Sequence, residues 1–120
     1  MPYLLFIYGT LHPDRAPREI AAAVRRLTPV GPATIRARLY NLGAYPGAIL
    51  DPTAPPISGH LFTVPDAATL AALDAYEDFR PTDPAASLFL RVETTATLPD
   101  GSHHPCWVYV YNRQVQGSRC

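Results

Sequence analysis

The 120-residue sequence contains no lysine, because all ten of its basic residues are arginines. The absence of lysine excludes Schiff-base chemistry and a lysine general base. The ten arginines are balanced by ten acidic residues, so the formal net charge is zero. This balance provides no general electrostatic case for binding nucleic acid or an anionic membrane.

Long apolar runs and disulfide-type cysteine patterns are also missing. No stretch approaches the roughly 18 to 20 continuous apolar residues of a membrane span, and the start lacks the basic flank and cleavage signature of a signal peptide. We therefore predict a cytoplasmic protein without a membrane partner. The two cysteines, Cys106 and Cys120, suit neither a disulfide framework nor a zinc site, and we interpret Cys106 as a small core residue.

The most informative segment that is present lies at the start of the chain. Residues 3–8 form an apolar, aromatic-rich run that is typical of a buried strand. The run breaks at Gly9, where a ligand could approach the main chain without a Cβ in the way. Residues 8–11, Tyr-Gly-Thr-Leu, therefore predict a loop whose N–H groups bind an anion or a carbonyl oxygen. The alternative is an ordinary strand-to-helix turn.

Two further segments have the periodicity of helices. Residues 18–27 carry Ile20, Val24 and Leu27 on one face, which predicts a scaffold helix. A second helix is predicted over residues 67–77, with Asp66 as its N-cap.

The second helix places a carboxylate toward the core. Glu77 follows Leu70 by seven positions and Leu73 by four, so it projects from the same face. The negative end of the helix dipole and burial both disfavour an anion there, which predicts a raised pKa and proton transfer near neutrality.

Two other features qualify that prediction. Asp74 lies at the edge of the same helical face. The alternative interpretation of Glu77 is a helix-end glutamate that is paired with an arginine such as Arg80 or Arg91.

The remaining pattern is that of strands. Residues 33–40 alternate between apolar and polar, as in a half-buried strand. Residues 88–98 and 106–111 flank a turn at 99–102, which predicts an antiparallel hairpin. Trp107, Tyr109 and Tyr111 share one face of its second strand, which is more typical of a core than of a ligand platform. Shorter strands are predicted at 48–50 and 57–64.

Four of these motifs, taken in order, resemble the γ-glutamylcyclotransferase-like family of small single-domain proteins. They are the Tyr8-Gly9-Thr10-Leu11 loop, the Tyr45-Pro46-Gly47 loop, the Leu73-Asp74-Ala75-Tyr76-Glu77 helix end, and Arg91 in the following strand. The ordered set spans most of the chain. It is more specific for the fold than for the activity.

The resemblance implies an α+β fold: a small mixed β-barrel of about five to seven strands with two main flanking helices. This single domain would cover residues 1–112, and residues 113–120 would form a C-terminal tail. Family members release 5-oxoproline from γ-glutamyl compounds, so the expected partner is a small-molecule γ-glutamyl substrate. The implied site has Glu77 as its catalytic residue. Its substrate-binding residues would be Tyr8, Gly9, Thr10, Leu11, Tyr45 and Arg91.

This chemistry needs little from the protein. The substrate's own α-amine attacks its γ-amide carbonyl, so one carboxylate can serve as both base and acid. The loop N–H groups would hold the substrate α-carboxylate or the developing oxyanion. No metal or organic cofactor is expected.

One residue departs from the family pattern. A tyrosine is expected two residues before Arg91, where this chain has Phe89, and the missing phenol removes a possible hydrogen bond to substrate or to Glu77. The alternative function is therefore a non-catalytic small-molecule binding module of the same fold. Hydrolysis through Cys106 and a histidine, and nucleic-acid binding through the aromatic strand, are weaker alternatives.

Overall fold

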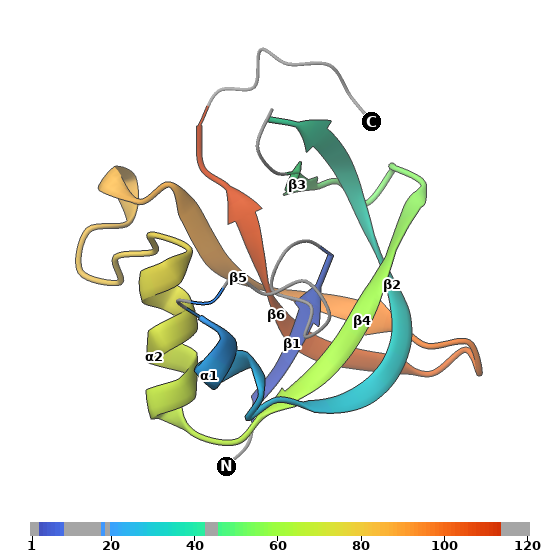
Figure 1. The fold of residues 1–120 in the computed structure, drawn as a ribbon. Helices are drawn as coiled ribbons and strands as arrows, with labels where there is room; N and C mark the ends of the chain where they lie inside the picture. The colour runs from blue at the N-terminus through green and yellow to red at the C-terminus, as the bar shows by residue number, and fades with distance from the viewer. Residues whose placement is uncertain (1–2, 9–17, 19, 43–45, 114–120) are drawn as a thin grey trace.

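The computed structural model describes residues 3–8, 18, 20–42 and 46–113. These residues form six strands, two α-helices and a short 3₁₀ helix at Pro84–Ala86 (Figure 1). The strands are β1 (Tyr3–Ile7), β2 (Thr28–Asn41), β3 (Pro46–Leu50), β4 (Pro56–Val64), β5 (Phe89–Thr97) and β6 (His103–Tyr111). The helices are α1 (Ala21–Val24) and α2 (Ala67–Tyr76).

Five of the strands form a closed barrel. The sheet runs β3-β2-β4-β1-β6-β5, and β5 pairs back onto β2 at Thr34 and Thr97 to close the ring. The pairing of β1 with β6 is parallel, whereas the other pairings among the described strands are antiparallel. The predicted α+β fold, a small mixed barrel with two flanking helices, is confirmed.

The first strand lies inside this arrangement. β1 pairs with β4 on one side and with β6 on the other, and Leu5, Phe6 and Ile7 are almost completely buried. A strand with neighbours at both edges and both faces covered should be nearly continuously apolar, as this one is. The run therefore ends with Tyr8 at the edge of the core.

Both helices lie together on one side of the barrel (Figure 1). The second agrees with prediction: the Asp66 side chain accepts a hydrogen bond from the Thr69 N–H at 2.8 Å, which caps α2. The first is shorter than predicted, because the chain turns after Val24 and enters β2 at Thr28, where it pairs with β4. Its apolar face is nevertheless buried as expected.

The core has two parts. One part joins the helices to the outer face of the barrel and includes Val24, Leu73 and Tyr109. The other fills the barrel interior and includes Phe6 and Cys106. The aromatic face of β6 and Cys106 are therefore core residues, as predicted.

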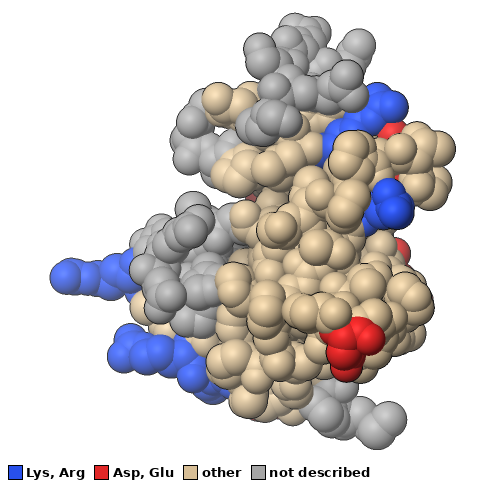
Figure 2. Space-filling view, turned by 90° about the vertical axis from the view of Figure 1, so that its right-hand side faces the viewer, with Lys and Arg blue, Asp and Glu red and all other residues tan. Residues whose placement is uncertain are grey.

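The charged side chains do not gather on the face that Figure 2 shows. Arginines there stand apart in small groups among uncharged residues, with no continuous basic band (Figure 2). In the described part of the chain, no helix has the length and apolar character needed to cross a membrane.

Candidate active site

Glu77 is fixed by the way α2 ends. The Phe79 N–H donates to the Asp74 carbonyl at 2.9 Å, and the Asp78 N–H donates to the Ala75 carbonyl at 3.2 Å. Asp78 has a left-handed backbone, with φ of 57°. These two bonds around a left-handed residue form a Schellman ending. Because Glu77 is the C-cap immediately before that turn, its backbone has a defined position and direction.

The Glu77 carboxyl group is half-buried, and this environment changes its chemistry. Burial raises its pKa from 4.5 to about 7. Among the described residues, Arg80 pairs with Asp78 and Arg91 with Asp74, and neither pairs with Glu77. The alternative of a glutamate neutralised by one of these arginines is therefore wrong.

Tyr8 is one of two tyrosines near Glu77. Its hydroxyl donates to the Tyr109 carbonyl at 2.5 Å and accepts from the Ala48 N–H at 3.1 Å, so it joins the ends of β1, β3 and β6. Burial raises the pKa of Tyr8 above its usual range, the bond from Ala48 opposes this rise, and the charge of Glu77 adds to it. Tyr8 therefore stays protonated, and its two hydrogen bonds tie its hydroxyl to β3 and β6.

Arg91 pairs with a residue that pattern reading did not assign. Its Nε donates to Asp74 Oδ1 at 2.8 Å and its Nη2 donates to Asp74 Oδ2 at 3.2 Å. Only 15% of its side chain is exposed. Arg91 therefore neither pairs with Glu77 nor faces solvent.

The second tyrosine near Glu77 is Tyr109, whose hydroxyl donates to Asp74 Oδ1 at 2.7 Å. Burial, followed by the bond to Asp74, raises its pKa well above the usual range, and the charge of Glu77 contributes as well. Phe89, which replaces the expected tyrosine, is buried against the Tyr111 ring at a centroid distance of 5.6 Å. The phenols whose acidity responds to Glu77 are therefore those of Tyr8 and Tyr109, and none comes from position 89.

Part of the predicted site lies outside the described residues. This applies to Gly9, Thr10, Leu11 and Tyr45, whose contribution to substrate binding stays a prediction. Asp74 is the residue that sequence reasoning left without a role. Its spacing of three positions from Glu77 was the available signal, since side chains three apart lie on one helical face.

The family model that matches this sequence decides its relationship. Residues 5–120 match the model described as "Gamma-glutamyl cyclotransferase, AIG2-like". The chain belongs to this family. Membership supports a cyclotransferase-type enzyme that acts on a small molecule, and it agrees with the resemblance inferred from the four sequence motifs.

Several solved structures share the fold. An AIG2-like protein from Mus musculus has a TM-score of 0.76 at 18% identity, covering 96% of this chain and 80% of that one. A protein described as γ-glutamyl cyclotransferase has a TM-score of 0.68 at 14% identity, with coverages of 92% and 67%. YkqA from Bacillus subtilis has a TM-score of 0.70 at 18% identity, and 93% of this chain spans only 36% of it. A search of curated protein sequences finds no match.

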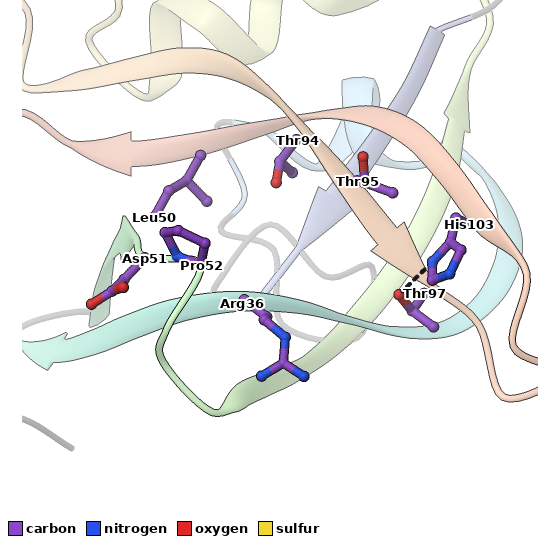
Figure 3. Close-up of a pocket in the computed structure, with 8 residues that line it drawn as sticks. All are labelled: Arg36, Leu50, Asp51, Pro52, Thr94, Thr95, Thr97 and His103. Carbon is purple, nitrogen blue, oxygen red and sulfur yellow. Dashed lines mark hydrogen bonds between the residues drawn. The ribbon is translucent and has the colours of Figure 1, made fainter.

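This member of the γ-glutamyl cyclotransferase family also has an open hollow of about 410 Å³ between β2 and β5, lined by no residue of α2. Figure 3 shows Thr94 of β5 on one side and Arg36 of β2 on the other, with the Arg36 side chain pointing away from β5. The carboxylate that lines this hollow belongs to Asp51, which pairs with Arg38 at 2.6 Å. Hydrogen bonds from Thr53, and then the charge of Arg38, lower the pKa of Asp51. Because the pKa of Asp51 is lowered and its carboxylate is already paired with Arg38, it is a poor general base.

Two other chemistries lack support among the described residues of this family member. No group of three or more histidine, cysteine or acidic side chains there could hold a metal ion. The Cys106 thiol is buried in the barrel, and burial raises its pKa to about 11. Since the thiolate is the reactive form of cysteine, Cys106 is not suited to act as a nucleophile.

Proposed function

We propose that this protein is a γ-glutamyl cyclotransferase that releases 5-oxoproline and a free amine or amino acid from a small γ-glutamyl compound. The observation that supports this most strongly is Glu77, a half-buried carboxyl whose pKa is raised to about 7. A group with this pKa exchanges a proton efficiently at neutral pH. Family membership supplies the reaction class.

The proposed reaction needs one mobile proton. Glu77 takes a proton from the substrate α-ammonium, and the freed amine attacks the γ-amide carbonyl carbon to close a five-membered ring. The carbon–nitrogen bond of the amide then breaks, and Glu77 returns the proton to the departing amine. Both reacting groups belong to one molecule, so holding it folded supplies much of the acceleration.

Substrate binding is proposed to involve the loop that follows β1. The N–H groups of Gly9 to Leu11 would hold the α-carboxylate or the oxyanion, with a hydroxyl from Thr10. Tyr8 and Tyr45 would form walls.

The Arg91 guanidinium already has the Asp74 carboxylate as a partner. A substrate carboxylate that bound Arg91 would therefore have to share this cation.

A second candidate function follows from Phe89. Because this position carries no phenol, the protein could keep its site and bind γ-glutamyl compounds without efficient turnover. A non-catalytic binding module is therefore the alternative.

A screen separates the two. Purified protein is incubated with a panel of γ-glutamyl amines and γ-glutamyl dipeptides, and 5-oxoproline is measured by mass spectrometry. We expect product from at least one member. Calorimetric binding of some members with no product from any would contradict the enzyme and establish the binding module.

A further inference from the structure

Two carboxylates lie three residues apart on α2 and have opposite surroundings. Asp74 is 7% exposed, accepts two bonds from Arg91 and one from Tyr109, and is the helical neighbour of Glu77. Glu77 has no cationic partner among the described arginines. Among the described residues, Asp74 therefore holds the Arg91 cation and Glu77 holds none.

The position of Arg91 is set from three sides. Asp74 binds its guanidinium in a two-point arrangement that a planar fork matches well. The carbon of the guanidinium lies 4.4 Å from the centre of the Trp107 ring and 5.6 Å from that of Phe79, within cation–π range. In the β5–β6 register, Arg91 lies directly opposite Tyr109. These contacts hold the charge at one place.

Arg91 and Glu77 are both close enough to the Tyr109 hydroxyl to influence its pKa. Burial and the bond to Asp74 are the main causes of the raised pKa of Tyr109, and the charges of Asp74, Arg91 and Glu77 also act on it. A guanidinium without a carboxylate partner in this half-buried region would favour the ionised form of Glu77 or bind it directly. Either event would make Glu77 a weaker base for the substrate proton, by lowering its pKa or by engaging its carboxylate in an ion pair.

We propose that Asp74 is a positioning residue: it neutralises Arg91, holds it against Trp107 and Phe79, and so leaves the Glu77 carboxyl free for the substrate. The significance of this arrangement rests on the proposed function, whereas the arrangement itself can be measured without turnover.

Other titratable groups belong to the described elements around Glu77. Tyr8, just after β1, and Tyr109 of β6 are protonated phenols. Glu93 of β5, two residues after Arg91 and opposite Trp107, is exposed, as is His60 of β4. Arg26, just after α1, donates to Thr69 in the first turn of α2, at the opposite end from Glu77. Asp78 and Arg80, which follow Glu77, pair with each other.

The test is a carbon-13 NMR titration of the glutamate carboxyl groups. The sequence contains three glutamates, and Glu77→Gln assigns the signal of interest by its loss. Asp74→Asn keeps the shape and leaves Arg91 unneutralised, so the Glu77 midpoint should fall by about one pH unit or more. Asp74→Asn combined with Arg91→Gln removes both charges and should restore the wild-type midpoint.

Two further variants make the result specific. Arg91→Gln alone leaves the Asp74 charge unpaired beside Glu77 and should raise the Glu77 midpoint. If circular dichroism shows that Asp74→Asn does not fold, the Arg91→Gln titration tests the proposal in its place. Asp51→Asn, in the hollow between β2 and β5, releases Arg38 and should leave the Glu77 midpoint unchanged. A purely structural role for Asp74 would not produce shifts of opposite sign, so unchanged Glu77 midpoints in the Asp74 and Arg91 variants would overturn the proposal.

The two hypotheses can fail separately. If wild-type protein forms no 5-oxoproline but the midpoints shift as stated, the proposed function fails and the charge arrangement stands. If product forms and the Glu77 midpoint ignores both substitutions, the function stands and the role of Asp74 fails.

Discussion

Glu77 at the end of α2 and Asp51 in the hollow between β2 and β5 are both carboxylates of the same small domain, and their surroundings shift their pKa values in opposite directions. Burial raises the pKa of Glu77 to about 7. Hydrogen bonds from Thr53, and then the charge of Arg38, lower the pKa of Asp51. The open hollow beside β5 is therefore the poorer candidate for acid–base chemistry.

The difference shows that partners, more than residue type, decide what a carboxylate can do. Asp51 has its cation on the neighbouring strand β2. Near Glu77 the corresponding cation, Arg91, is already bound by Asp74. Four measurements test this difference between the two carboxylates.

Apart from the loss of Glu77 itself, the largest effect is expected in the pH dependence of turnover. Glu77 must be ionised to accept a proton, so kcat/KM for 5-oxoproline release should fall about tenfold per pH unit below about pH 7. Assays between pH 5 and 8 measure this. Asp51→Asn should show the same profile, and an acidic limb centred near 4.5 would mean that an ordinary carboxyl is responsible.

Stability should depend on pH in opposite senses at the two carboxylates. The folded pKa of Glu77 lies above its unfolded value of 4.5, so the free energy of unfolding falls as pH rises from about 4.5 to 7. The full shift corresponds to about 3 kcal/mol, and partial exposure reduces it to about 2 kcal/mol. Urea unfolding at pH 5 and pH 8 should show that Glu77→Gln removes this loss.

Asp51 provides the contrast when the urea unfolding is extended below about pH 4, where its carboxyl group titrates. Its folded pKa is lowered, so it stabilises the fold above its unfolded pKa, and this stabilisation is lost as the pH falls through the folded value. Asp51→Asn should therefore change the pH dependence in the direction opposite to Glu77→Gln. Equal changes of the same sign would contradict the assignment of both environments.

A smaller effect is expected from Tyr8→Phe. The substitution removes the donor to the Tyr109 carbonyl and the acceptor for the Ala48 N–H, which should lower the free energy of unfolding by about 1 to 2 kcal/mol. Urea unfolding at one pH measures this loss. Wild-type stability in the variant would show that the hydroxyl does not hold the three strand ends together.

Local pattern was sufficient for the elements whose signals lie within one segment. The apolar run of β1, the Asp66 cap of α2 and the inward direction of Glu77 all follow from spacing along the chain. The length of α1 did not, because β2 begins at Thr28 to meet β4, and that pairing is a long-range event.

The partner of Arg91 was also beyond local pattern. Asp74 and Arg91 are 17 residues apart, and their contact depends on how α2 packs and on the β5–β6 register, which places Arg91 opposite Tyr109. Sequence spacing placed Asp74 at the edge of the inward face of its helix and Tyr109 on the aromatic face of its strand. It could not predict that the Tyr109 hydroxyl donates a hydrogen bond to Asp74.

The most direct test of the central claim compares wild-type protein with Glu77→Gln on the best substrate of the panel. Turnover to 5-oxoproline should fall about 10² to 10⁴-fold, while calorimetric affinity for the substrate stays close to that of wild type. Wild-type turnover in the variant would contradict the role of Glu77 as the proton carrier.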